Sequence, residues 1–355
     1  TKNRFMNDRE NILRAARFEQ PECIPISIGI SEGCWDHYPQ DALQELMAAH
    51  RLLFPGFQKT ADKITPDCAP WRRAGHPYTD SWGCVWETAE TGITGAVVKH
   101  ALADWDAFRA YRPPSPEQHN GWGSIDWPSI REGVSKWREK GGLTCGSLRH
   151  GHTFLTMIYL RGYENLMFDM CDEHPQLPAL IEMIEQFNRG LVERFVAAGV
   201  EWMSYPEDLG MQQGPMLSPD QFRRYIKPTY ERLIAPARQA GYVIHMHSDG
   251  DIRELAGDLI EVGIDVINLQ DLVNGIPWME ANLKGRVCID LDIDRQSVTR
   301  FGTPDEIDDH VRTAVERLGS RAGGLILNYG LYPGVPLENI RALMDAMEKY
   351  SQHFS

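Results

Sequence analysis

Several features that would place a chain in a common class of protein are missing from these 355 residues. No apolar run is long enough to cross a bilayer, and the first residues, TKNRFMNDRE, do not follow the pattern of a signal peptide. The 7 cysteines are odd in number and include no Cys-x-x-Cys pair. These absences favour a cytoplasmic protein whose thiols are kept reduced.

Basic residues are also scarce. The chain has 36 Lys and Arg against 50 Asp and Glu, which gives a formal net charge of -14. Because phosphate binding depends on Lys and Arg, this balance argues against nucleic acid and against an anionic membrane surface as partners. No Gly-x-Gly-x-x-Gly motif follows the first apolar run, Ile24–Ile30, so a dinucleotide-binding fold is disfavoured as well.

The chain does contain a regular alternation of short apolar runs with helix-like segments. The runs are Ile24–Ile30, Leu143–Leu148, Val200–Tyr205, Tyr242–His247, Asp265–Leu269, Arg286–Ile289 and Gly324–Asn328, with a weaker eighth near Phe57–Ile64. Capping signals open three of the helices, at NDRE (Asn7–Glu10), SPDQ (Ser218–Gln221) and TPDE (Thr303–Glu306). The pattern predicts an α/β protein: a single (β/α)8 TIM barrel over residues 1–355, preceded by a helical extension at the amino terminus.

The segment from about residue 71 to 137 departs from this alternation. It is rich in Trp, Gly and Pro, and it shows little helical period before Ser129. We expect it to be an insertion over one mouth of the barrel, with a hairpin through ETAETGITGAVVK (residues 87–99), because its apolar residues are too few for a separate core.

Polar side chains break the apolar run that begins at Tyr242. On an extended strand alternate side chains share a face, so His245, His247 and Asp249 point the same way, and Gly250 permits a tight turn after them. His245 lies deeper in the strand, where it can be either a ligand or a hydrogen-bonded core residue. Barrel enzymes carry their chemistry at the carboxyl ends of strands, which makes this end a candidate site.

The other predicted strands end in similar groups. They are Arg149, His150 and His152, then Glu207 and Asp208, then Gln270 and Asp271, then Asp290 and Asp292, then Asn328 and Tyr329. Asp271 and Asp292 can equally cap the next helix, and the two histidines can be ordinary loop residues. Imidazole and carboxylate suit Zn²⁺, for which Glu207 is the best third ligand beside His247 and Asp249. Asp208 can act as a general base or bind substrate.

Four stretches together resemble the uroporphyrinogen decarboxylase superfamily, and especially its cobalamin-dependent methyltransferase branch. They are the segment from PEDLGMQQGPMLSPDQ through YVIHMHSDG to DLIEVGIDVINLQD, and the shorter DSWGCVWETAETGITG, RGYENLMFDM and PGVPLENIRALMDA. The resemblance covers nearly the whole chain, and it implies a (β/α)8 barrel. The arginine-containing segment that grips tetrapyrrole carboxylates in the decarboxylases is replaced by GISEGCWDHYP, which disfavours that substrate.

The methyltransferases of this branch bind zinc through the His and Cys of a His-x-Cys-Gly motif and through a later Cys. The His falls on His247, the first Cys falls on Asp249, and the second falls near Tyr329, so both thiolates are absent. Oxygen ligands make a more Lewis-acidic metal, which suits an oxygen-bearing substrate better than a thiol.

The resemblance therefore implies transfer of a methyl group from a small methylated aromatic substrate, an aryl methyl ether, to the cobalt of a separate corrinoid protein. We expect Glu207, His247 and Asp249 to hold Zn²⁺, Asp208, His150 and Tyr329 to act in catalysis, and Arg149, Asn328 and Gln270 to bind substrate. A decarboxylase of a small or tetrapyrrole carboxylate, a metal-dependent hydrolase and a non-enzymatic metal or corrinoid carrier are the alternatives. A homodimer is compatible with the sequence.

Overall fold

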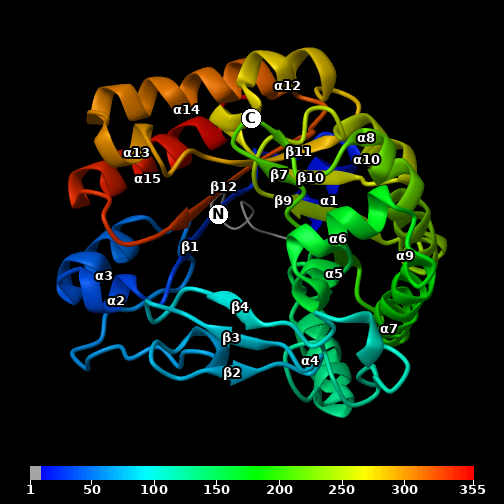
Figure 1. The fold of residues 1–355 in the computed structure, drawn as a ribbon. Coiled ribbons are helices and arrows are strands. Elements are labelled where there is room, and N and C mark those ends of the chain that lie inside the picture. Colours follow the sequence, from blue (N-terminus) through cyan, green and yellow to red (C-terminus); the bar gives the residue numbers. More distant parts are fainter. Residues whose placement is uncertain (1–8) are drawn as a thin grey trace. The chain divides into compact units, whose positions relative to one another are not determined.

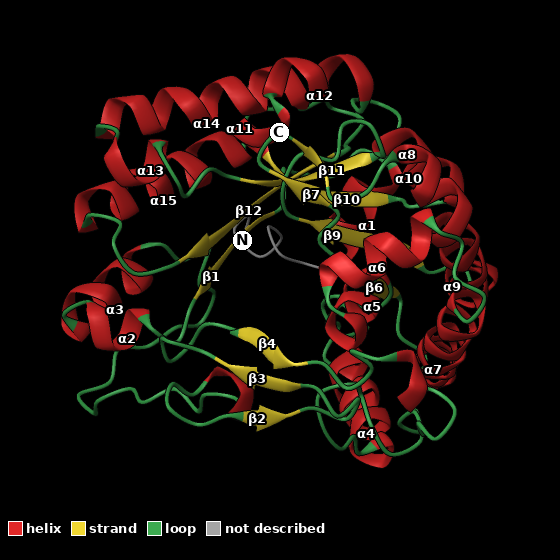
Figure 2. Cartoon of the chain, in the orientation of Figure 1, coloured by secondary structure: helices red, strands yellow, loops and turns green. Residues whose placement is uncertain are grey.

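Parallel strands alternate with helices along the chain, as the sequence predicts (Figures 1 and 2). The structure is a computed structural model, and it describes residues 9–355. Contacts divide the described chain into two units, one made of residues 9–68 and 265–355 and the other of residues 69–264. Within the described residues each of the seven stronger apolar runs forms a parallel strand, four in the first unit and three in the second.

The sheet of the first unit has the order β1, β12, β11, β10. These strands are β1 (Ile26–Ile30), β12 (Leu325–Leu331), β11 (Cys288–Asp292) and β10 (Val266–Gln270). Their carboxyl ends lie level, since Gln270 pairs in register with Asp292, and Asp292 with Asn328. The polar strand ends of this unit are therefore neighbours, as parallel pairing requires.

Helices cover this sheet, and the longest pair, α14 (Pro304–Leu318) and α15 (Leu337–Ser351), pack side by side. The predicted capping box opens α14, because Thr303 and Glu306 each accept the hydrogen bond that the box requires. Helix α1 (Arg9–Arg17) is the predicted amino-terminal helix, although Asn7 and Asp8 of its capping signal lie outside the described residues. The remaining helices are α2 (Cys34–His37), α3 (Gln40–Ala49), α11 (Asp271–Asn274), α12 (Ile276–Asn282) and α13 (Val298–Phe301).

The prediction of an eighth strand near residues 57–64 is wrong. This segment is an irregular loop in the structure. Side chains of α3 supply its hydrogen bonds in place of a neighbouring strand: Gln44 accepts from the backbone N–H of Thr60, and Gln40 accepts from that of Ile64. A closed eight-stranded barrel stays a prediction.

The second unit contains a parallel sheet of β5 (Cys145–Ser147), β6 (Trp202–Ser204) and β9 (Val243–Ser248), in that order. Ser218 caps the turn α8 (Pro219–Gln221) as its sequence predicts. The helices that follow or flank these strands are α5 (Phe154–Arg161), α6 (Tyr163–Cys171), α7 (Leu177–Ala198), a π-helical turn η3 (Phe222–Ile226), α9 (Lys227–Gln239) and α10 (Ala256–Val262).

The predicted insertion belongs to this second unit. Its strands β2 (Tyr78–Thr79), β3 (Val85–Glu87) and β4 (Ala96–Lys99) form an antiparallel sheet, and the β3–β4 hairpin lies where the sequence predicts it. The helical elements of the insertion are η1 (Pro70–Arg72), η2 (Trp105–Ala107) and α4 (Trp127–Glu139). Outside the insertion, the second unit also contains a small hairpin of β7 (Gly210–Met211) and β8 (Gly214–Pro215).

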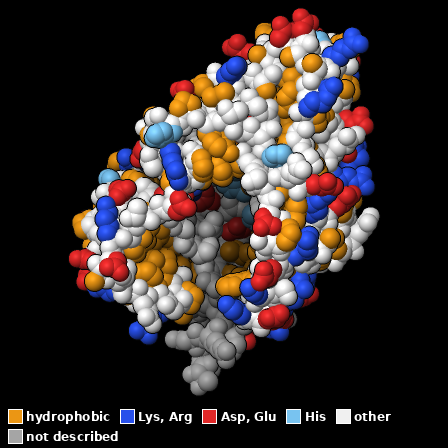
Figure 3. Space-filling view, turned by 90° about the horizontal axis from the view of Figure 1, so that it is seen from below, with side chains coloured by type: hydrophobic (Ala, Val, Ile, Leu, Met, Phe, Trp, Pro, Cys, Tyr) orange, Lys and Arg blue, Asp and Glu red, His pale blue; other side chains and the backbone are white. Residues whose placement is uncertain are grey.

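The surface carries charge of both signs, and acidic and basic side chains are interspersed on the face that Figure 3 shows. Among residues 9–355, no helix combines the length and apolar character that a membrane span requires.

Candidate metal centre

Three side chains from neighbouring strands of the second unit converge on one point. His150 follows β5, Asp208 follows β6, and His247 lies near the end of β9. Their potential ligand atoms all lie within 4.8 Å of one another. The distance to Asp208 Oδ1 is 3.3 Å from His150 Nε2 and 3.5 Å from His247 Nε2. Because the carboxyl ends of adjacent parallel strands meet at one edge, three residues far apart in sequence become neighbours.

The spacing and chemistry of these atoms fit a zinc ion. Ligand atoms at about 2.0–2.1 Å from a tetrahedral Zn²⁺ ion are about 3.3 Å apart, close to the two distances given above. Two imidazole nitrogens and one carboxylate oxygen form a three-ligand set that leaves a fourth position for substrate. The side chains are 42%, 29% and 22% exposed for His150, Asp208 and His247, so a ligand can reach them.

Neighbouring side chains keep the carboxyl group of Asp208 ionised. Burial favours a raised pKa for this carboxyl, but the hydrogen bonds and charges of His150 and His247 outweigh burial and hold its pKa well below the usual range. Its Oδ1 also accepts a hydrogen bond from the backbone N–H of Asp249 at 2.9 Å. The sequence predicts a catalytic role for Asp208, whereas this geometry places its carboxylate between the two histidines, where it could serve as a metal ligand.

Asp249, a predicted metal ligand, lies beside the cluster. Its Oδ1 is 3.9 Å from His247 Nε2, and its side chain is 39% exposed. The turn after it requires glycine, because Gly250 has φ +81° and a Cβ there would lie 2.2 Å from the backbone of Gly210. Asp249 therefore lies next to the cluster, and its role as a ligand stays a prediction.

Glu207, the other predicted ligand, is fully buried away from the cluster. It accepts hydrogen bonds from the backbone N–H groups of Thr153 at 2.8 Å and Leu155 at 2.9 Å, and from the hydroxyl of Tyr230. Burial raises its pKa to about 7 against these hydrogen bonds. These hydrogen bonds turn Glu207 away from the cluster, whereas Asp208, the next residue, faces His150 and His247. Glu207 instead holds the start of α5, and with it the loop that carries His150.

The other two histidines predicted near strand ends, His152 and His245, are not in the cluster. His152 is buried, its Nδ1 is 2.7 Å from Thr153 Oγ1, and burial together with the charge of His150 lowers its pKa to about 3. His245 Nδ1 lies 2.7 Å from Ser204 Oγ. His245 is thus hydrogen-bonded within the sheet, one of the two alternatives that its position in the strand allowed.

Arg149, predicted to bind substrate, has internal partners. Its Nη1 donates to Asp80 Oδ2 at 2.9 Å and to the carbonyl of Gly121 at 2.7 Å, and its side chain is 3% exposed. The Trp122 ring lies 3.9 Å from its guanidinium carbon. This arginine therefore joins the insertion to the end of β5.

Three predicted site residues lie in the first unit. Gln270 and Asn328 are at the carboxyl ends of β10 and β12, where Asn328 Oδ1 accepts a hydrogen bond from Ser27. Tyr329 is buried with its hydroxyl 2.9 Å from Thr299 Oγ1, and burial raises its pKa to about 12. Their roles in substrate binding and catalysis stay predictions.

Sequence reasoning missed Tyr159, which lies on α5 within the apolar stretch FLTMIYL. A Cβ built on Gly151, the residue after His150, would lie 2.9 Å from the Tyr159 hydroxyl. Burial raises the pKa of Tyr159, and the negative charges of Asp208 and Glu207 add to this against the opposing charge of Arg149. The hydroxyl is therefore near the cluster, and no pattern in the sequence distinguishes it from a packing residue.

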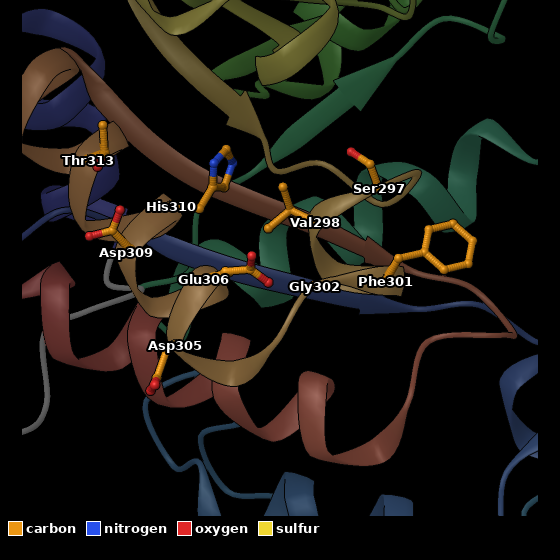
Figure 4. A pocket seen from close by; sticks show the side chains of 9 residues that line it. All are labelled: Ser297, Val298, Phe301, Gly302, Asp305, Glu306, Asp309, His310 and Thr313. Atoms are coloured by element: carbon orange, nitrogen blue, oxygen red, sulfur yellow. The ribbon is translucent and has the colours of Figure 1, made fainter.

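A separate pocket lies on the helical layer of the first unit (Figure 4). It is lined by Ser297, Val298, Phe301, Gly302, Asp305, Glu306, Asp309, His310 and Thr313. His310 Nε2 is 2.6 Å from Asp271 Oδ2, and this carboxylate is almost fully buried. Asp271, which the sequence left between a site and a cap, therefore forms an ion pair and accepts from the N–H of Leu272 as well.

Because of the ion pair between His310 and Asp271, we expect the free energy of unfolding to depend on pH. Burial lowers the pKa of His310, but the hydrogen bond and charge of Asp271 outweigh burial, so the pKa is raised in the folded state. The pair therefore stabilises fully below the unfolded histidine pKa of about 6.5, and this stability is lost as the pH rises through the folded pKa. We expect His310→Gln to lower the free energy of unfolding in urea more at about pH 5.5 than at about pH 9. An equal loss at both pH values would contradict the ion pair.

Comparison with known proteins relates both units to one family. A family model described as uroporphyrinogen decarboxylase (URO-D) matches residues 80–350. Curated relatives include the uroporphyrinogen decarboxylases of Thermus thermophilus, 30% identical over 134 residues that cover 38% of each chain, and of Pongo abelii, 26% identical over 165 residues that cover 44% of this chain and 42% of that one. These matches span less than half the length of the curated relatives.

Among solved structures, a methyltransferase from Methanosarcina mazei superposes with a TM-score of 0.64 at 18% identity, covering 96% of this chain and 98% of that chain. At this identity the likeness shows a shared fold. The family model spans well over half of the 355 residues. The chain therefore belongs to the uroporphyrinogen decarboxylase family.

Proposed function

We propose that this protein transfers a methyl group from a small methoxylated aromatic compound to the Co(I) of a corrinoid protein. The observation that supports this proposal most strongly is the cluster of His150, Asp208 and His247, which offers nitrogen and oxygen ligands and no thiolate. Family membership and the fold shared with a methyltransferase support an enzyme of this class. A ligand set without thiolate favours an ether over a thiol as the substrate.

The reaction requires stabilisation of the negative charge that develops on the ether oxygen. The Co(I) electron pair forms a bond to the methyl carbon while the C–O bond breaks, and its electrons remain on a phenolate, which is a poor leaving group. A Zn²⁺ ion held by His150, Asp208 and His247 supplies, when bound, Lewis acidity toward an oxygen ligand. Around that position the chain itself contributes the negative charge of Asp208 and the rigid turn at Gly250, which hold the site's geometry.

Tyr159 is the best-placed hydrogen-bond donor to the departing oxygen. Within residues 9–355 its hydroxyl makes no hydrogen bond, and it lies against Gly151 beside the cluster. We expect Tyr159→Phe to lower the rate of methyl transfer by about 10²-fold, because it removes one donor to the developing phenolate. Zinc affinity should stay unchanged in this variant. Single-turnover kinetics with a donor that the enzyme accepts measure the rate, and an unchanged rate removes Tyr159 from the mechanism.

The reaction class can be tested directly. The Zn²⁺-loaded enzyme is mixed with free cob(I)alamin and, in turn, with a panel of methoxylated aromatics, and the methyl–cobalt absorption is followed. We expect transfer from at least one donor, and none with Asp208→Asn. If no donor methylates cobalt while the enzyme releases carbon dioxide from a carboxylate, it is a decarboxylase, and metal-dependent hydrolysis of an ester or amide would indicate a hydrolase.

A further inference from the structure

The guanidinium of Arg149 lies in an aromatic enclosure built largely by the insertion. Its carbon is 3.9 Å from the Trp122 ring and 5.2 Å from the rings of Trp86 and Tyr159. Trp122 in turn stacks on Trp71 with a centroid distance of 4.9 Å. A cation is attracted to aromatic faces, but rings alone do not replace the hydration that a buried charge loses.

Asp80 supplies the compensating charge. Its carboxylate is fully buried and accepts from Arg149 Nη1, from the backbone N–H groups of Trp82 and Cys84, and from Trp86 Nε1. The Nε and Nη2 atoms of Arg149 are buried without a hydrogen-bond partner. The arginine therefore depends on this single carboxylate of the insertion, and Asp80 at the same time shapes the turn between β2 and β3.

The residue after Arg149 is the metal ligand His150. The side chain of His150 is 42% exposed beside Asp208 and His247, so packing around its ring supports it only in part. The backbone around it is fixed instead. On one side the N–H groups of Leu148 and Gly151 donate to the carbonyls of Ser204 and Pro206. On the other side the buried Arg149 side chain anchors the chain to the insertion.

We infer that Arg149 is a positioning residue for His150, and that the insertion's Asp80 acts through it on the geometry of the metal cluster. The inference rests on the metal site proposed above. It gives the insertion a part in forming the site, because any displacement of Asp80 shifts the backbone that presents one of the three ligands. Groups that orient a metal ligand without touching the metal typically contribute about 10–100-fold to metal affinity, and we expect an effect of the same order here.

The chain offers a matched control for the test. Arg161 is equally buried: it pairs with Asp169 at 2.9 Å, donates to the carbonyl of Leu102 and lies 4.2 Å from the Trp105 ring. It lies at the end of α5 and is not adjacent in sequence to any residue of the cluster. Arg149→Met and Arg161→Met thus remove the same kind of interaction, but only the first is next to a ligand.

The experiment titrates Co²⁺ into the full chain and follows the visible absorption of the bound ion, with urea unfolding measured in parallel. We expect both substitutions to lower stability, but only Arg149→Met to weaken Co²⁺ binding, by about 10–100-fold, and to alter the spectrum. Asp80→Asn should weaken binding in the same direction, and Arg149→Lys should restore it only in part. If Arg149→Met does not fold, the Co²⁺ affinity and spectrum of Asp80→Asn test the positioning role instead, because this substitution keeps the side-chain volume.

The results of the Co²⁺ titrations distinguish the positioning role of Arg149 from the existence of the metal site. A wild-type chain that binds no Co²⁺ overturns both the metal site and the role of Arg149. Tight binding by the wild type together with unchanged affinity and spectrum in Arg149→Met and Asp80→Asn overturns the positioning role alone. An equal loss of affinity in Arg161→Met also overturns it, because general destabilisation would then account for the effect.

Discussion

Replacing His247 by alanine is expected to abolish stoichiometric zinc binding and methyl transfer while leaving the protein folded. His247 provides one of three ligand atoms, and its Nε2 lies 3.5 Å from Asp208 Oδ1. Loss of a direct ligand should lower zinc affinity by about 100-fold or more, beyond what the loss of a supporting residue costs. Because the side chain is 22% exposed at a strand end, the free energy of unfolding should change by only about 1 kcal/mol.

His245 is the matched control for this substitution. It lies two residues earlier on the same face of β9 and is hydrogen-bonded to Ser204. We expect His245→Ala to keep one zinc ion per chain, as measured by elemental analysis after dialysis, although it lowers stability. If His247→Ala retains its zinc and His245→Ala loses it, the ligand on β9 is the deeper histidine and the cluster is wrongly composed.

Removing the carboxyl group of Glu207 is expected to have the largest effect on stability. Glu207→Ala leaves the N–H groups of Thr153 and Leu155 and the hydroxyl of Tyr230 without their acceptor, and it opens a cavity. These losses together should cost about 3–4 kcal/mol. Glu207→Gln keeps the shape and one acceptor oxygen, so its cost should be about 1 kcal/mol. Urea unfolding of the metal-free proteins measures both values.

The same pair of variants distinguishes a structural from a ligating role. Glu207→Gln should still bind one zinc ion with an affinity within about tenfold of the wild type, since the residue only supports the loop of His150. Complete loss of zinc from a well-folded Glu207→Gln would show that Glu207 ligates the metal, as its position in the sequence predicts.

The strands were predictable because their pattern is local. The seven stronger apolar runs each became a parallel strand, and the polar residues that end them include all three members of the cluster. The failed eighth strand, near residues 57–64, shows the limit of this reasoning. Its backbone hydrogen bonds go to Gln40 and Gln44, and no local pattern indicates that choice.

The composition of the site depended on information that the sequence pattern does not carry. Glu207 and Asp208 are adjacent acids, and which of them faces the cluster is decided by the buried hydrogen bonds of Glu207. The sequence predicts that Arg149 binds substrate, but its counterion in the structure is Asp80, 69 residues away in the chain. Tyr159 resembles any packing residue of an apolar helix until the fold places it against Gly151.

We propose that His150, Asp208 and His247 together bind a metal ion. The most direct measurement is a crystal structure of the zinc-loaded protein with an anomalous difference map collected at the zinc edge. We expect one strong peak at about 2.0–2.2 Å from His150 Nε2, Asp208 Oδ1 and His247 Nε2. A peak at Glu207 or beside His310, or a map without any peak in protein that retains one zinc per chain in solution, would show that these three residues do not form the metal site.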